Sequence, residues 1–141
     1  MNILFFLTPK AKCDYLREEN NIRQALERME GTGFMALPIL GKDGRYKGTL
    51  TEGDLLWSLK NLCDMDLQKA RNHSIMEIAH RRDNQPVRVD PRVEDLFSKA
   101  LDQNFVPVVD DRGTFIGIVT RSAIMRYCME TYIKPDKKDA L

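Results

Sequence analysis

Two parts of this 141-residue chain repeat one another in a single register. Identical residues recur 69 positions apart in four places, at Pro38 and Pro107, Gly44 and Gly113, Gly48 and Gly117, and Thr51 and Thr120. A gapless register over about twenty residues indicates an internal repeat, in which each copy is a structural unit that buries its apolar face against its neighbour. The chain is therefore predicted to fold as one compact domain or as two small halves that share a core.

Each copy contains a corner where an apolar strand is predicted to lead into an amphipathic helix. In the first copy, Thr51 is a candidate N-cap and Asp54 follows in the first helical turn, where the helix dipole favours negative charge. This corner is interpreted either as an ordinary helix cap or as a polar receptor for a sugar diol. The second copy keeps Thr120 but has Ala123 at the position of Asp54, so the two corners should differ in chemistry.

Apolar periodicity predicts the same order of elements in each half, namely strand, helix, strand, strand, helix. In the first half the strands are expected at residues 13–17, 35–40 and 46–50, with helices that begin near Ile22 and Thr51. In the second half they are expected at residues 87–89, 105–109 and 115–119, with helices that begin at Asp90-Pro91 and Thr120. Residues 1–12 are predicted to be a lead-in, because Pro9 ends a short apolar start.

The predicted fold class is α+β, with two pseudo-symmetric β-α-β-β-α repeats packed as one module. The first repeat is expected at residues 8–64, a connecting segment at 65–84 and the second repeat at 85–133. Within the connecting segment, Ile75, Ile78 and Ala79 are predicted to share a short helix. Residues 80–83 form a local basic cluster, interpreted as a solvated linker or as a phosphate contact.

Composition narrows the classes of function. The 22 basic and 21 acidic residues balance to a net charge of +1, which argues against a nucleic-acid platform. Apolar runs are too short for a membrane span. Three widely spaced cysteines indicate neither a metal site nor a disulfide framework, and they favour a cytoplasmic location. Common catalytic motifs are absent from the sequence, so an enzyme is not expected.

The motifs resemble those of the cystathionine-β-synthase (CBS) domain pair, or Bateman module, over about residues 8–132. The resemblance rests on the apolar-Pro-apolar segments 36–40 and 105–110, and on the corners 48–54 and 117–120. It implies a regulatory module without a required cofactor, similar to small stand-alone bacterial CBS-pair proteins. The implied ligand contains adenosine, such as AMP, ADP, ATP, S-adenosylmethionine or cyclic di-AMP.

Residues 104–107 together with Thr120 and Arg121 also resemble the cyclic di-AMP-binding members of the family. Those members tend to carry a second arginine where this chain has Ser122. The resemblance further implies a homodimer that signals to a regulated protein of unknown identity. The dimer is expected to form through two helix stripes, one of Leu55, Leu56, Leu59 and Leu62, the other of Ile124, Met125 and Met129.

The resemblance implies two ligand clefts, each built across the repeats. The first would contain Thr51, Asp54, Pro86, Val87, Asn104 and Phe105. The second would contain Thr120, Arg121, Lys12, Cys13, Tyr15, Met35 and Ala36. Apolar groups would enclose the base, the carboxylate would accept from the ribose hydroxyls, and the cations would bind phosphate.

The main alternative is a ligand-free dimerisation or scaffold module. Such a module would keep the fold and lose the polar corner. Ala123 shows this loss in one repeat, whereas Asp54 argues against it in the other.

Overall fold

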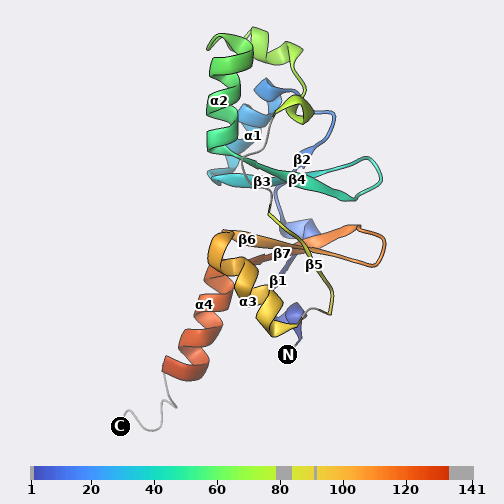
Figure 1. Cartoon of the computed structure of the whole chain (residues 1–141), viewed down its shortest axis with the longest axis vertical. Helices are drawn as coiled ribbons and strands as arrows, with labels where there is room; N and C mark the ends of the chain where they lie inside the picture. The colour runs from blue at the N-terminus through green and yellow to red at the C-terminus, as the bar shows by residue number, and fades with distance from the viewer. Residues whose placement is uncertain (1, 79–83, 91, 134–141) are drawn as a thin grey trace.

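The computed structural model describes residues 2–78, 84–90 and 92–133, and in it two β-sheets face one another with helices on their outer sides (Figure 1). The first sheet has the order β2-β3-β4, and the second has the order β1-β7-β6-β5. Helices α1 and α2 cover the first sheet, while α3 and α4 cover the second (Figure 1). The fold is α+β, with one β-α-β-β-α unit in each half.

The bounds of the elements follow the repeat. The first unit consists of β2 (Leu16–Arg17), α1 (Ile22–Thr32), β3 (Ala36–Leu40), β4 (Tyr46–Thr51) and α2 (Glu52–Cys63). The second consists of β5 (Val87–Arg88), α3 (Val93–Asp102), β6 (Phe105–Val109), β7 (Phe115–Thr120) and α4 (Arg121–Cys128), which continues as a π-helical segment, Met129–Ile133. Short 3-10 helices lie at Ile3–Phe5, Lys10–Lys12, Lys69–Asn72 and Ile75–Glu77.

The two units also share their strand register. Ala36 pairs with Thr51 in the first sheet, and Phe105 pairs with Thr120 in the second. Each hairpin has a register shift at the same place, after Ile39 and after Val108. Because register decides which face each side chain occupies, the two units present equivalent residues to equivalent surroundings.

A separate apolar core stabilises each unit, so the expectation of one core shared by two halves is wrong. The first contains Leu16, Ile22, Leu37, Ile39, Leu50 and Leu55, and the second contains Val87, Leu96, Val106, Val108, Val119 and Ile124. The two helix stripes expected at a dimer interface are therefore divided. Leu55 and Ile124 are buried and Leu59 packs against the first core, whereas Leu56, Leu62, Met125 and Met129 stay exposed.

The prediction of a lead-in before residue 13 is wrong, because Leu7–Pro9 forms β1 and pairs antiparallel with β7. Pro9 is tolerated there because β1 is an edge strand, where a missing backbone N–H costs no ladder bond. The pairing is close at Pro9 and Gly117, and a Cβ at Gly117 would clash with the Thr8 carbonyl oxygen.

Three of the four main helices begin where expected, with Asn21, Thr51 and Thr120 as their N-caps. Asn21 and Gln24 form a capping box at α1, and Thr51 and Asp54 form one at α2. The expected start of α3 at Asp90 is wrong, since its N-cap is Arg92. Glu94 and Asp95 lie in the first turn of α3. Their negative charges interact favourably with the helix dipole and so stabilise the helix.

Two smaller expectations are also corrected. The strand expected at residues 13–17 is confined to Leu16–Arg17. The short helix expected in the connecting segment is a 3-10 turn, Ile75–Glu77, capped by Ser74. Ala79, the basic cluster at 80–83 and Pro91 lie outside the described residues.

The two hairpin turns join the units to one another. The Tyr46 N–H donates to the Gly113 carbonyl at 3.2 Å, and the Phe115 N–H donates to the Gly44 carbonyl at 3.0 Å. The rings of Tyr46 and Phe115 stack with their centroids 6.4 Å apart. These contacts set the two sheets against each other at their hairpin turns.

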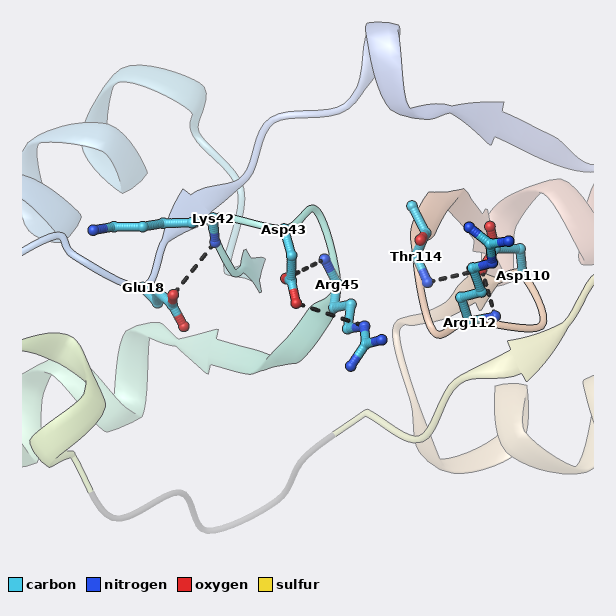
Figure 2. A network of polar contacts seen from close by, with 7 residues as sticks. All are labelled: Glu18, Lys42, Asp43, Arg45, Asp110, Arg112 and Thr114. Carbon is cyan, nitrogen blue, oxygen red and sulfur yellow. Dashed lines mark hydrogen bonds and ion pairs between the residues drawn. The ribbon is translucent and has the colours of Figure 1, made fainter.

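Figure 2 shows the two turns with an aspartate folded over each. Asp43 accepts from the Arg45 N–H at 3.1 Å, and Asp110 accepts from the N–H groups of Arg112 and Thr114, each at 2.9 Å. These bonds hold the pKa of both carboxyl groups below the ordinary value, with the Arg45 and Thr114 amides as the largest causes.

Candidate ligand-binding site

A cavity of about 670 Å³ lies between the units, beside the corner where β7 leads into α4. Its lining comes from the segment after β1, from the starts of β3 and β6, and from the β7–α4 corner. The residues are Thr8, Lys12, Cys13, Asp14, Gly33, Phe34, Met35, Ala36, Leu37, Pro38, Asn104, Phe105, Ile118, Thr120, Arg121, Ser122 and Met125. This volume lies within the range of about 300–1,000 Å³ that is typical of small-molecule sites.

The β7–α4 corner is held by hydrogen bonds at the start of the helix. The Thr120 hydroxyl accepts from the Ala123 N–H at 3.1 Å and lies 3.2 Å from the Ser122 hydroxyl. The Arg121 N–H donates to the Asn104 carbonyl at 3.0 Å. These bonds bring the residues before Pro107 next to the corner of their own repeat.

Arg121 has a fixed position at the cavity. Its Nε donates to the Ala100 carbonyl at 2.8 Å, and its Nη2 contacts the Leu101 carbonyl at 3.4 Å. A guanidinium at the carboxyl end of α3 is favoured by the helix dipole. Arg121 therefore supports α3 and at the same time places a positive charge in the cavity lining.

The N-terminal segment contributes an uncharged thiol, Cys13, and a cation, Lys12, to the cavity lining. The thiol contacts the carbonyl oxygens of Thr8 and Pro9 at 3.4 and 3.3 Å. Burial raises the pKa of the Cys13 thiol, so the thiol form is retained at neutral pH. Lys12, at the preceding position, is exposed and adds a cation to the cavity lining.

The opposite wall is apolar and accessible. Phe34 and Met35 have relative exposures of 54% and 65%, which are high for large apolar side chains. Phe105 is buried and contributes to the same lining. Exposed apolar side chains that converge on a cavity are typical of a surface that a ligand or partner covers.

The structure groups the expected site residues differently from the resemblance. Lys12, Cys13, Met35, Ala36, Thr120 and Arg121 line one cavity, as expected for the second cleft. Asn104 and Phe105, expected in the first cleft, line this cavity too. Tyr15 lies instead in a neighbouring hollow, among Lys10, Arg17 and Arg28.

Sequence reasoning missed several lining residues, among them Thr8, Phe34, Ser122 and Met125. Two of these had a signal. Phe34 precedes Met35 in the connection between α1 and β3. Met125 lies about one helical turn after Arg121. Thr8 could not be found in this way, because its strand was not recognised.

The corner of the first repeat is more closed. Asp54 has a relative exposure of only 4%, and its carboxylate accepts from the Thr51 N–H at 2.9 Å. The Thr51 hydroxyl accepts from the Asp54 N–H at 3.0 Å. Asp54 borders a small hollow of about 170 Å³, together with Trp57, Ser58 and Ile78. The complete motif thus forms a helix cap at α2.

Pro86 is partly buried before β5, and Val87 is buried in the second core. Within residues 2–78, 84–90 and 92–133, no group of three or more His, Cys, Asp or Glu residues could hold a metal ion. Among the helices described here, none is long and apolar enough to cross a membrane.

The CBS domain family model matches the chain twice, at residues 9–61 and 75–130. The chain belongs to the CBS domain family. Cyclic di-AMP receptor B of Bacillus subtilis is 23% identical to this CBS pair over 121 residues, which cover 86% of the chain and 82% of the receptor.

Two solved structures show the same fold as this CBS pair. The crystal structure of CbpB in complex with c-di-AMP has a TM-score of 0.81 at 20% identity, and covers 92% of this chain and 85% of that chain. The structure of CBSX2 in complex with AMP has a TM-score of 0.73 at 23% identity, and covers 92% and 96% of the two chains. The tandem CBS architecture is thus established by sequence and by structure.

Proposed function

We propose that this CBS pair is a regulatory module that binds an adenine nucleotide in the cavity at the β7–α4 corner. The observation that carries the proposal is the cavity itself, which combines an accessible apolar wall with the Thr120 and Ser122 hydroxyls and two cations, Lys12 and Arg121. A flat base can pack against the apolar wall, while hydroxyls and cations suit phosphate oxygens.

The lack of a carboxylate at Ala123 favours phosphate over ribose as the main polar contact of this corner. A phosphate-rich ligand or a cyclic dinucleotide should therefore bind better than adenosine. The relatives support this class of ligand, since one is named a cyclic di-AMP receptor and solved structures hold c-di-AMP or AMP.

Regulation rather than catalysis follows from where the ligand would sit. The cavity is lined by both repeats, with Met35 and Ala36 from one and Asn104 and Thr120 from the other. A ligand that binds one arrangement of the repeats better than another shifts the population toward it. A partner protein that contacts both repeats could then respond to the nucleotide.

A matched pair of variants tests the proposal. Thr120→Val and Thr51→Val each remove a helix-capping hydroxyl, so both should lose about 1 kcal/mol of stability. Only Thr120 lines the cavity, and loss of a hydrogen bond to a charged group should weaken binding about tenfold or more. Calorimetry with c-di-AMP, ATP, ADP, AMP and adenosine would measure this. Failure of the wild type to bind any of them would refute the proposal.

The expected ligand contacts of Thr51, Asp54, Pro86 and Val87 at a first cleft stay predictions. A dimerisation or scaffold module remains the second candidate. It is favoured by the exposed apolar residues of α2 and α4, such as Leu56 and Met125. A thermal-shift screen separates the two, because a ligand that binds the native state raises its apparent stability.

A further inference from the structure

A second hollow, of about 840 Å³, opens beside the cavity near β2 and α1. Three cationic side chains contribute to it, from Lys10, Arg17 and Arg28, together with the aromatic ring of Tyr15. Of the described residues that line it, Asp14 is the one acid. We call this region the basic hollow.

Within the part of the chain that the structure describes, the cations of the basic hollow make only weak side-chain contacts. The Lys10 Nζ lies 5.7 Å from the centre of the Tyr15 ring, and the Arg17 Cζ lies 5.9 Å from it. Arg28 Nη2 lies 3.6 Å from Asp14 Oδ1, in a pair whose side chains are both exposed. Cation–π contacts and exposed ion pairs contribute little stability, so an entering anion can replace them.

The basic hollow adjoins the cavity, since Cys13 and Asp14 line both. One molecule can therefore occupy the cavity and extend past Cys13 toward Arg17. The excess of positive charge lies in the direction of the extension, at Lys10, Arg17 and Arg28. Phosphate groups are the anionic part of a nucleotide that arginine binds best.

We propose that the basic hollow holds the outer, phosphate-bearing part of a nucleotide whose base lies in the cavity, which makes larger anionic nucleotides better ligands than AMP. This inference rests on the proposed function. Two ligands share the required chemistry, namely a nucleoside triphosphate and a cyclic dinucleotide. Tyr15 distinguishes them, because a second base can stack on its ring whereas a triphosphate chain cannot.

The test compares Arg17→Ala with Arg71→Ala in the full chain. Arg71 is an exposed arginine outside both linings, so its removal changes the net charge equally and controls for long-range electrostatics. Calorimetry would measure the affinities for AMP, ATP and c-di-AMP. Arg17→Ala should weaken ATP or c-di-AMP at least about tenfold and AMP less than about twofold, while Arg71→Ala leaves all three near wild type.

Further variants identify the ligand and guard against misfolding. Arg17→Lys should restore most of the lost affinity if charge is the main contribution. Tyr15→Leu should weaken c-di-AMP more than ATP if a second base stacks there, and both equally if only phosphates enter. Lys10→Ala replaces Arg17→Ala if the latter does not melt cooperatively.

Two results would overturn the inference. In the first, Arg17→Ala weakens the affinity for AMP as much as the affinity for the larger ligands. In the second, Arg17→Ala folds and keeps wild-type affinity for all of them. Either result would show that Arg17 does not contact an outer phosphate group. A wild-type protein that binds no nucleotide would refute both the proposed function and this inference. A wild-type protein that binds nucleotide, with no effect of Arg17→Ala, would refute this inference alone.

Discussion

Asp54 and Ala123 occupy equivalent positions in the two repeats, yet their surroundings differ. The Asp54 carboxylate is buried and accepts from the Thr51 N–H, which closes the capping box of α2. At Ala123 only the backbone N–H takes part in the cap, and the corner opens onto the cavity. One substitution between repeats thus accompanies the change from a capped corner to a candidate binding site.

Asp54→Ala should lower the free energy of unfolding by about 1–3 kcal/mol, because it removes a buried acceptor from the Thr51 N–H. Nucleotide affinity at the cavity should change little. Thermal melts and calorimetry on the same variant would check both, with Asp111→Ala at an exposed turn position as the control. A folded variant that has lost nucleotide affinity would instead support the ribose contact implied by the family motif.

At the scale of elements, the turn between β6 and β7 depends on Asp110. Its pKa lies below the ordinary value because the Thr114 and Arg112 amides donate to the carboxylate. The charged form is therefore favoured in the folded state. The stability that it contributes is present above the pKa of the unfolded state and is lost as the pH falls through the lowered folded pKa.

Asp110→Asn should reduce the melting temperature at neutral pH, and the difference from wild type should shrink as the protein is acidified below the ordinary aspartate range of about 4. Melts from neutral to strongly acidic pH would measure it. Asp111→Asn, at the next position, controls for the loss of one negative charge. A difference that stays constant across the whole range would exclude Asp110 as the source of the pH dependence.

Elements with local landmarks were predictable from the sequence, and those without were not. The strand–turn–strand segments around Pro38 and Pro107, and the helix after Thr51, carry short apolar runs, turn glycines and caps within a few residues. Strand β1 has three residues and obtains its partners from Val119, Ile118 and Gly117, near the other end of the chain. A short window cannot reveal such pairing.

The same distinction applies to the site. The repeat register placed Thr120, Arg121 and Met35 at element ends, and these residues do line one cavity. Asn104 reaches that cavity through its own repeat, because β6 pairs with β7 and the Arg121 N–H donates to the Asn104 carbonyl. The resemblance had assigned Asn104 to the other cleft. The basic hollow around Tyr15 depends on the path of the chain between β1 and β2, and had no signal of its own.

At the scale of the molecule, exposed apolar residues on α2 and α4 favour a homodimer. We expect light scattering at micromolar concentration to give twice the 16.3 kDa chain mass. Leu62→Arg on α2 should reduce that mass to one chain, because a charge at a packed interface is costly. Leu101→Arg, at an exposed position of α3, is the matched control. A monomer mass for the wild type, with and without nucleotide, would contradict the prediction.

The antiparallel pairing of Leu7–Pro9 with β7 has a consequence for how the protein is made. During synthesis, β1 leaves the ribosome long before Gly117 exists, so the second sheet cannot close until nearly the whole chain has emerged. Contacts of such long range slow folding, and until β1 docks, the edge of β7 is open to pairing with other chains. A truncated form that lacks the N-terminal strand would therefore be prone to association before it is able to respond to any ligand.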